Sequence, residues 1–521
     1  MQSRQPGRAW AAAFAIAFVV VTLGDLANLG RPLVRDQSLF LLGAHEMHEG
    51  AVLYRDFWDL KGPGVYLFYL VAGVLGGFTP LAVHAFALAC ELAFAAALVV
   101  AMRRFSASPG LAAGAAIAAI APSGVLASPN QQIQVEGLAG LPLFLAAWSA
   151  AEGARAGSER TRLAWFAFGG VAAGFALALK LLFAPLIVLA LVAATFRRST
   201  GARQVMRDAA AVLAGALVPT LTTIAYFTAN GALRLALDAW FVVPPAIVAT
   251  LPSQHTSVLV DGFVWFVKRF ASVEVLAAVG VVVALRRGTT ALERALLGWL
   301  VAAPVVILAQ RTSWWDYQWL LLVVPLGVFA AIGGDALVAF ARAPLASRRL
   351  RVALAIGATC ALLVLPLRAF LASSATLAAH HFALTPTSRE AYRRDTSTAY
   401  RDATSDAHLV PVGGTFYAFG DPLIYLTTGR RQALALNGWS PELLIARQRA
   451  ELERAFRTHP PRYLYFTKVA SGGDVIAVRM PSLARFIARA YASRVTGAFG
   501  TLYAMRPTDA SATSSGRPSR R

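Results

Sequence analysis

Long apolar runs follow one another through the first 371 residues, and they constrain the fold of this chain more than any other feature. The whole chain is 57% hydrophobic and only 14% charged, a balance that soluble domains of this length rarely have. The sequence therefore predicts an α-helical polytopic membrane protein with about eleven transmembrane helices in residues 1–371. These expected spans lie near residues 10–29, 81–102, 110–128, 135–151, 163–179, 181–196, 208–229, 271–285, 292–309, 316–341 and 352–371.

Two of the early apolar runs allow more than one interpretation. The run 10–29 is long for the apolar core of a signal peptide, and no clear small-residue cleavage site follows it, so we favour a retained first helix with a cytoplasmic N-terminus. The run Val65–Phe78 has about 14 residues, which is short for a span. A crossing there would place Arg103 and Arg104 outside, so we expect this run to be re-entrant or to lie on the outer face.

Basic residues gather in short loops on one side of this alternation, which is the bias of cytoplasmic loops. The net charge of +21 is then an orientation signal, and it does not indicate nucleic acid binding. An Arg- and Ala-rich composition is typical of GC-rich bacteria, so we expect the bacterial inner membrane. The loop arginines are Arg155, Arg160, Arg162, Arg197, Arg198, Arg203, Arg207, Arg286, Arg287, Arg294, Arg342, Arg348, Arg349 and Arg351.

Residues 372–507 have the composition of a water-soluble domain, which the alternation places outside the membrane. We expect a small exported α/β domain, followed by a disordered tail at 508–521. A helix is predicted from Ser440-Pro441-Glu442 to about Arg457, and a second one over Ser482–Arg494. Strands are predicted at Thr415–Phe419, Ala433–Leu436, Tyr463–Thr467 and Thr501–Met505.

One polar passage, Asp36–Gly64, is held between apolar runs in the first expected outer loop, residues 31–80. Charged groups beside a membrane are costly to desolvate, so such a passage either faces water or does chemistry. Its pattern contains Asp36, Tyr54-Arg55-Asp56-Phe57, Asp59 and Lys61-Gly62-Pro63-Gly64.

This pattern resembles the first periplasmic loop of the GT-C glycosyltransferases, and in particular the bacterial relatives of the dolichyl-phosphate-mannose protein mannosyltransferases, glycosyltransferase family 39. The resemblance implies transfer of a sugar from a polyprenyl-phosphate donor to an acceptor on the outer face, with inversion. It extends to Lys180, to Trp314-Trp315-Asp316-Tyr317, and to Phe419-Gly420-Asp421-Pro422 with Tyr425 and Gly429-Arg430.

The chain departs from the family pattern at two positions. Gln37 stands where the family usually has Glu, which weakens any metal-binding role there, and Gly62 stands where it has a second proline, so we expect a looser backbone.

A lipid-linked sugar donor needs a carboxylate in water and a cation at the level of its phosphate. We expect Asp36 to be the general base; a solvated loop acid or a helix cap is the alternative. Lys61 is the candidate phosphate clamp, helped by Arg55 and Lys180. The chain has only four lysines against 44 arginines, so two lysines at the outer boundary indicate a need for lysine there. For Lys180, snorkelling from an apolar helix is an equal alternative.

Several other polar residues of the passage have supporting roles in this interpretation. Tyr54 is part of the motif, while Asp56 and Asp59, three apart, would share one face of a helical turn and orient Arg55 and Lys61. A divalent cation there stays open, and we assign none. A pair of histidines, His45 and His48, has metal-like spacing, but this spacing is also typical of the polar face of an interfacial helix.

Outer helix ends contribute the remaining candidates. Glu136 lies near an outer end where an acceptor or donor headgroup could be contacted. Arg311, Asp316 and Tyr317, on another outer turn, would complete the pocket wall, and an aromatic belt of neighbouring tryptophans is the alternative for that turn. Glu91, in the middle of a span, has no assigned role.

Three functional classes remain open from the sequence. The first is a membrane glycosyltransferase with a lipid or glycan acceptor, favoured over a protein acceptor. The second is a transporter or lipid flippase, for which charges deep within several spans are expected. The third is a receptor whose exported domain binds a ligand. The sequence does not give the sugar, the acceptor or the oligomeric state.

Overall fold

The computed structural model describes residues 5–106, 108–196, 201–342, 348–468 and 472–507. Eight described helical segments are long and apolar enough to cross a membrane, which makes this a multi-pass membrane protein and does not confirm the predicted count of about eleven. They are α1 (Gln5–Asp25, apolar from Gly7), α4 (Pro80–Phe105), α5 (Pro109–Leu126), α8 (Glu159–Leu179), α10 (Ala202–Ala229), the segment Leu233–Thr250, α14 (Ala291–Leu308), and Asp316–Arg342, which contains α15 (Val323–Arg342).

The other expected spans are helical but shorter or more polar. Residues 135–151 divide into α6 (Val135–Leu138) and α7 (Gly140–Arg155), and 181–196 contains the twelve-residue α9 (Ala184–Thr195). The last expected span lies within α16 (Arg348–Ala379), which continues past the expected domain boundary at residue 371.

The passage from residue 230 to 270 is more helical than the sequence predicted. It contains α11 (Leu233–Leu237), a π-helical turn over Asp238–Val242 and α12 (Val243–Thr250). After a short break, the 32-residue α13 (Thr256–Arg287) begins fifteen residues before the expected span. Prolines in the first turn of α12 are compatible with a helix start, because the first-turn amides have no partner within the helix.

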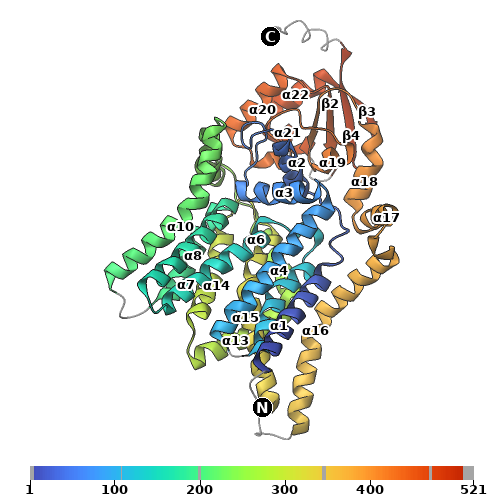
Figure 1. Ribbon diagram of the computed structural model, residues 1–521. Helices are drawn as coiled ribbons and strands as arrows, with labels where there is room; N and C mark the ends of the chain where they lie inside the picture. The colour runs from blue at the N-terminus through green and yellow to red at the C-terminus, as the bar shows by residue number, and fades with distance from the viewer. Residues whose placement is uncertain (1–4, 107, 197–200, 343–347, 469–471, 508–521) are drawn as a thin grey trace.

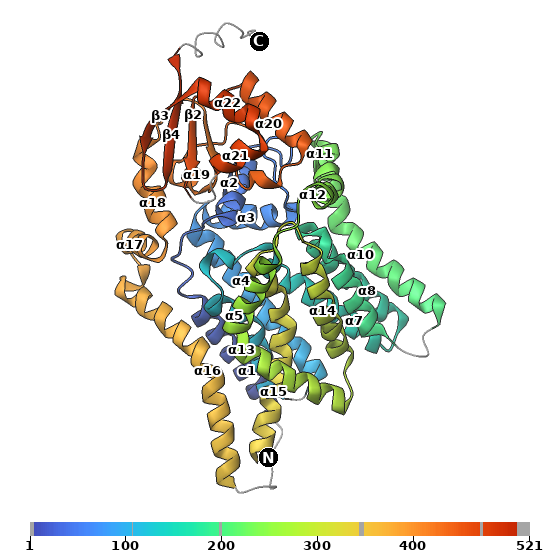
Figure 2. The same cartoon turned by 180° about the vertical axis from the view of Figure 1, so that it is seen from behind.

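The run Val65–Phe78 forms the short helix α3 (Pro63–Gly76). Figures 1 and 2 show α3 and α2 (Asp36–His48) at one end of the bundle, directly beneath the C-terminal domain, with the N-terminus at the opposite end. In both views α3 lies across this end of the bundle.

Buried aromatic rings hold α2, the following loop and α3 together. The ring of Tyr66 lies 5.8 Å from that of Phe40 and 5.9 Å from that of Phe57. Gly43 allows this approach, because a Cβ there would lie 2.5 Å from the Tyr66 ring. The polar loop is therefore built on a rigid aromatic core.

The C-terminal domain is a four-stranded sheet with helices around it (Figure 1). The strand order is β1-β2-β4-β3, with β1 (Phe416–Phe419) parallel to β2 (Tyr463–Thr467), while β4 (Gly500–Met505) runs antiparallel to both β2 and β3 (Tyr491–Thr496). The helices are α17 (Pro386–Thr396), α18 (Thr398–Asp406), α19 (Leu423–Thr428), α20 (Ala446–Thr458), α21 (Gly472–Arg479) and α22 (Pro481–Ala490).

Three of the predicted strands are confirmed, and three local predictions are wrong. Ala433–Leu436 is not a strand. Within it only Leu436 forms an isolated β-bridge, and the neighbouring Gln432 and Gly438 form two more. Ser440 has φ +54° and begins a 3₁₀ turn, so helix α20 starts only at Ala446. The predicted helix over Ser482–Arg494 ends at Ala490, because the chain then enters β3. The predicted disordered tail, 508–521, lies outside the described residues.

Candidate active site

Three of the predicted residues meet at the end of the bundle that lies beneath the C-terminal domain. The Lys61 Nζ lies 3.5 Å from Asp36 Oδ2 and 3.4 Å from the Tyr317 hydroxyl oxygen. Asp36 is the first residue of α2, yet its carboxylate accepts from the Trp439 indole Nε1–H at 2.6 Å and does not cap the helix. A carboxylate, an ammonium and a phenol therefore share one half-buried site.

The backbone that carries Asp36 is strained. Arg35 has φ +57° and ψ −128°, a conformation that a residue with a Cβ rarely adopts. Its amide donates to Oδ1 of Asp421, a fully buried carboxylate from the C-terminal domain. Strain of this kind persists where the surrounding structure imposes it, and it is common at functional sites.

The loop that carries Lys61 is fixed from both sides. The Tyr54 hydroxyl donates to the Lys61 carbonyl at 2.8 Å and accepts from Trp240 Nε1 at 2.9 Å. Asp59 is 8% exposed and accepts a hydrogen bond from the Tyr66 hydroxyl at 2.8 Å. Burial raises the pKa of Asp59, against the lowering effect of nearby Lys61. Tyr54 therefore holds the backbone of Lys61, and Asp59 places a negative charge near its amine.

The charge of Lys61 is stabilised by its neighbours. Burial lowers the pKa of this amine, but Tyr317 and the carboxylates of Asp36, Asp59 and Glu136 outweigh that effect, so the pKa lies well above its ordinary value. Lys61 is therefore an ammonium at neutral pH, as a phosphate clamp requires.

The prediction of a looser backbone at Gly62 is wrong. A Cβ at Gly62 would lie 2.3 Å from the carbonyl oxygen of Ala178, and one at Gly64 would lie 2.8 Å from the Leu179 amide nitrogen. The glycines let this loop pack directly on the last turn of α8, which ends at Leu179, just before Lys180.

A second cluster lies beside the first. The Lys180 Nζ lies 2.7 Å from Glu136 Oε1 and 2.5 Å from Gln310 Oε1. Burial and nearby Lys61 lower the pKa of Lys180, and Glu136 raises it, with a net lowering. Because Lys180 is paired with a buried carboxylate, it is not simply snorkelling toward water.

Two glutamines connect the outer turns to the site. Gln131 Nε2 donates to Asp316 Oδ2 at 2.5 Å, and Asp316 Oδ1 accepts from the Tyr317 amide at 2.8 Å. Gln37, which replaces the family's usual glutamate, donates through Nε2 to the Gln132 carbonyl at 2.5 Å and to the Pro129 carbonyl at 2.9 Å. A glutamate would have no N–H for those two carbonyls, so the glutamine suits this environment.

Three predicted site residues lie outside this arrangement. Arg55 is exposed and pairs with Asp56 at 2.7 Å and with the Asn230 carbonyl at 2.9 Å, and no contact joins it to Lys61 in the described structure. Asp56 and Asp59 do not share a helical turn, since this loop is not helical. Arg311 donates to the Val248 carbonyl at 2.9 Å and is exposed.

The histidine pair of α2 packs on an aromatic ring. The rings of His45 and His48 lie 4.8 and 5.0 Å from that of Phe78. Glu46 accepts from the Gln432 amide at 3.2 Å, and Glu49 pairs with Arg431. Among the described residues, no three His, Cys, Asp or Glu side chains come together as a metal site would require.

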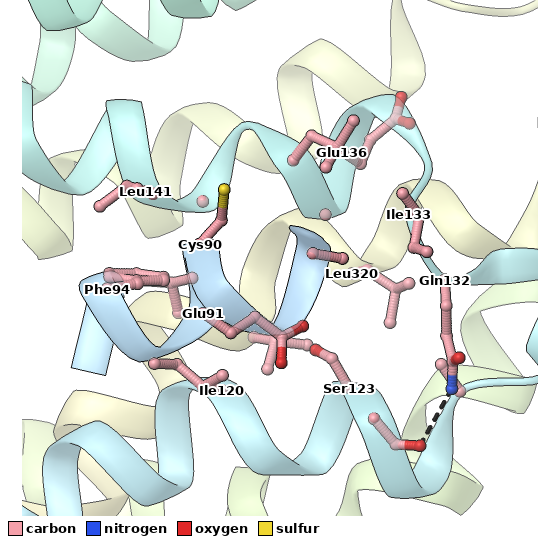
Figure 3. A pocket seen from close by; sticks show the side chains of 18 of the residues that line it. Cys90, Glu91, Phe94, Ile120, Ser123, Gln132, Ile133, Glu136, Leu141 and Leu320 are labelled. Atoms are coloured by element: carbon pink, nitrogen blue, oxygen red, sulfur yellow. Dashed lines mark hydrogen bonds between the residues drawn. The ribbon is translucent and has the colours of Figure 1, made fainter. Parts of the chain in front are cut away.

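A cavity of about 240 Å³ opens within the bundle next to the site. Figure 3 shows Glu91 entering it from α4, with Glu136 at its far end and Gln132 along its wall, where Gln132 Nε2 donates to the Gly124 carbonyl at 2.9 Å. Most of its other lining residues are apolar, and Asp25 and His84 also line it. Glu136 therefore lines the cavity and also belongs to the Lys180 cluster.

Sequence reasoning missed Trp439, Asp421 as a site residue, Gln310 and Gln131. The sequence signal for Asp421 was present, since its motif was recognised, but nothing local indicated that it contacts Arg35. Trp439 lies 403 residues from Asp36, and only the packing of the C-terminal domain brings the two together.

The architecture is that of the GT-C fold, a polytopic helical bundle with a smaller C-terminal domain at one end. No protein-family model and no curated protein matches the chain in sequence. Its fold is similar to two crystal structures of ArnT from Cupriavidus metallidurans, bound to undecaprenyl phosphate (14% identity) and in the apo state (13% identity).

In both ArnT comparisons the TM-score is 0.59 and the match covers 96% of this chain and 98% of ArnT. The archaeal oligosaccharyltransferase AglB from Archaeoglobus fulgidus, in complex with an inhibitory peptide and a dolichol-phosphate, matches with a TM-score of 0.49 and 12% identity. That match covers 96% of this chain and 74% of AglB.

Proposed function

We propose that this protein is a membrane glycosyltransferase that moves a sugar from a polyprenyl-phosphate donor to a lipid or glycan acceptor. The observation that carries the proposal is the cluster of Asp36, Lys61 and Tyr317 at the outer end of a GT-C fold. The ArnT structure with undecaprenyl phosphate, which has the same fold, supports a polyprenyl-phosphate donor.

In the proposed reaction Asp36 is the general base. Its carboxylate takes the proton from an acceptor hydroxyl while that oxygen attacks the anomeric carbon. The bond from the anomeric carbon to the phosphate oxygen breaks, and the polyprenyl phosphate leaves with the electron pair. Attack from the face opposite the leaving group inverts the anomeric configuration.

Lys61 stabilises the leaving phosphate. The reaction concentrates negative charge on the phosphate oxygens, and a fixed ammonium in a partly desolvated site lowers the energy of that charge. The Tyr317 hydroxyl lies within 3.4 Å of the same ammonium and is placed to donate to the phosphate. Lys180 lies close enough to add a second positive charge, but its pairing with Glu136 reduces that contribution.

The cavity gives the lipid a place beside the site. Its lining is mainly apolar, and it includes Glu136, which pairs with Lys180. We assign the part of the donor lipid nearest the phosphate to this cavity.

The site faces the periplasm of a bacterial inner membrane in this proposal. Arginines at helix ends gather near the N-terminal end of α1, as cytoplasmic loops require. The Arg103 guanidinium lies 5.5 Å from the Trp10 ring, and Arg155 lies 4.5 Å from the Phe105 ring. The C-terminal domain at the other end of the bundle is then exported, with the active site beneath it.

Native mass spectrometry of the detergent-purified protein tests this proposal. The wild type is expected to carry a polyprenyl-phosphate species, and Lys61→Ala is expected to lose it, because the clamp for the phosphate is gone. Lys268→Ala is a matched control, since Lys268 is an exposed lysine of α13 away from the cluster. A wild type without such a lipid after incubation with undecaprenyl phosphate, or equal lipid in Lys61→Ala, contradicts the proposal and favours a transporter.

A further inference from the structure

The C-terminal domain reaches into the active site through one side chain, Trp439. Its indole Nε1–H donates to Asp36 Oδ1 at 2.6 Å, while Lys61 lies 3.5 Å from Oδ2 of the same carboxylate. The two oxygens of the proposed base therefore have different partners, one from the C-terminal domain and one from the first outer loop.

The loop that presents Trp439 is fixed by neighbouring hydrogen bonds. Asn437 Nδ2 donates to the Trp58 carbonyl at 2.6 Å, and Asn437 Oδ1 accepts from the Trp439 amide at 3.0 Å. The Gly438 carbonyl accepts from the Gly420 amide at 2.9 Å, and a Cβ at Gly438 would lie 2.1 Å from the Ala418 carbonyl oxygen. Hydrogen bonds therefore join the loop of Trp439 both to the end of β1 and to the loop of Lys61.

A second contact from the C-terminal domain acts on the residue before Asp36. Asp421 Oδ1 accepts from the Leu423 amide at 3.0 Å and from the Arg35 amide at 3.3 Å. Arg35 is the residue with the strained backbone, at φ +57°. Asp36 is thus held through its backbone by Asp421 and through its side chain by Trp439.

We propose that Trp439 is a positioning residue for the base Asp36, and that the C-terminal domain thereby completes the active site of this enzyme. The inference rests on the proposed glycosyltransferase function. The indole occupies Oδ1 in a hydrogen bond of 2.6 Å, which fixes the orientation of the carboxylate. Oδ2, turned toward Lys61, is left as the oxygen that receives the acceptor proton.

Several titratable or charged groups interact with the same carboxylate, and a test variant has to leave them in place. They come from the loop of Lys61, the bundle and the C-terminal domain, and they are Asp59, Lys61, Tyr66, Tyr69, Lys180, Tyr317, Asp421 and Glu442. All of them remain in Trp439→Phe, which removes only the N–H donor and part of the ring.

A binding-independent measurement tests the contact itself. The eleven tryptophans are replaced by 5-fluorotryptophan, and the ¹⁹F resonance of residue 439 is assigned from Trp439→Phe. Asp36→Asn is expected to shift that resonance. Trp148 in α7, whose Nε1 donates to Glu152 Oε1 at 3.1 Å, is the matched reference. Glu152→Gln should shift the Trp148 resonance and leave the Trp439 resonance unchanged. An unchanged residue 439 resonance in Asp36→Asn overturns the inference.

The rate of polyprenyl phosphate release from a panel of polyprenyl-phosphate hexoses and pentoses tests the role. Trp439→Phe is expected to lower kcat at least tenfold with little change in donor KM, as loss of a hydrogen bond to a charged group predicts. Trp148→Phe should match the wild type.

The outcomes separate this inference from the proposed function. If the wild type releases the lipid and Trp439→Phe does so with the same kcat and donor KM, the positioning role is wrong and the enzyme assignment stands. If the wild type processes no donor, the proposed function fails, and the role of Trp439 fails with it.

Discussion

Gly62→Ala perturbs the phosphate clamp without touching its charge. Gly62 follows Lys61 directly and lies against the last turn of α8, where a Cβ would be 2.3 Å from the Ala178 carbonyl oxygen and 2.6 Å from that of Leu179. Both neighbours are backbone atoms of a packed helix, so they cannot rotate away as a side chain would. The loop of Lys61 must therefore move instead.

The size of that movement follows from the distances. An ordinary Cβ contact begins near 3.4 Å, so the loop has to withdraw by about 1 Å. A misplacement of about 1 Å in a catalytic site typically costs about 100-fold in rate. We therefore expect kcat/KM to fall about 100-fold, while overpacking lowers stability by roughly 1–3 kcal/mol.

Release of polyprenyl phosphate from the donor panel measures this effect, and thermal unfolding in detergent shows that the variant is folded. Gly334→Ala in α15 is the control, because a Cβ there would meet nothing within 4 Å. A folded Gly62→Ala variant with wild-type kcat/KM would refute the argument that this glycine positions Lys61.

Three further predictions concern buried charges. Burial raises the pKa of Asp421 from 3.8 to about 6, so the folded state binds the proton more tightly than the unfolded state does. The free energy of unfolding should therefore fall as pH rises from about 4 to 6, by roughly 3 kcal/mol in total. In pH-dependent thermal unfolding, Asp421→Asn should lose this decline. Lys180→Met leaves the Glu136 carboxylate without its partner, in a side chain that is only 2% exposed. This should lower the free energy of unfolding by roughly 3–5 kcal/mol. Adding Glu136→Gln should recover most of the unfolding temperature, and a double variant as unstable as Lys180→Met would contradict the pairing. Glu91 forms no ion pair with a described residue, so Glu91→Gln should not lower the unfolding temperature, and a clear decrease would show that its charge is needed.

The membrane architecture was predictable because apolar length and arginine bias are local properties of the sequence. The helices of the passage 230–270 were not, although Leu233–Thr250 is apolar, because this segment is divided into short pieces. A π-helical turn over Asp238–Val242 separates α11 from α12, and a short break precedes α13. The start of helix α20 was also not predictable at Ser440. The Ser440 side chain suits a helix start, but its left-handed backbone is set by the turn that brings Trp439 to Asp36.

The site was predictable where motifs are local and contiguous. Asp36 and Lys61 stood out by charge and spacing, and Tyr317 by its place on an outer turn, although nothing in the sequence gave their distances. Arg55 belongs to the same motif as Lys61, yet it faces Asp56 and Asn230, because the loop turns at Tyr54, where φ is +69°. Trp439 has no motif at all, and its role comes only from tertiary contact.

The most direct test of the account is the rate of sugar transfer by Asp36→Asn. This variant keeps the size and the hydrogen-bond acceptor for Trp439 but cannot take a proton. The account predicts that release of polyprenyl phosphate falls by about 10²–10⁴-fold, with the bound lipid and the unfolding temperature retained. A folded Asp36→Asn protein that turns over donor at the wild-type rate would contradict the assignment of Asp36 as the base.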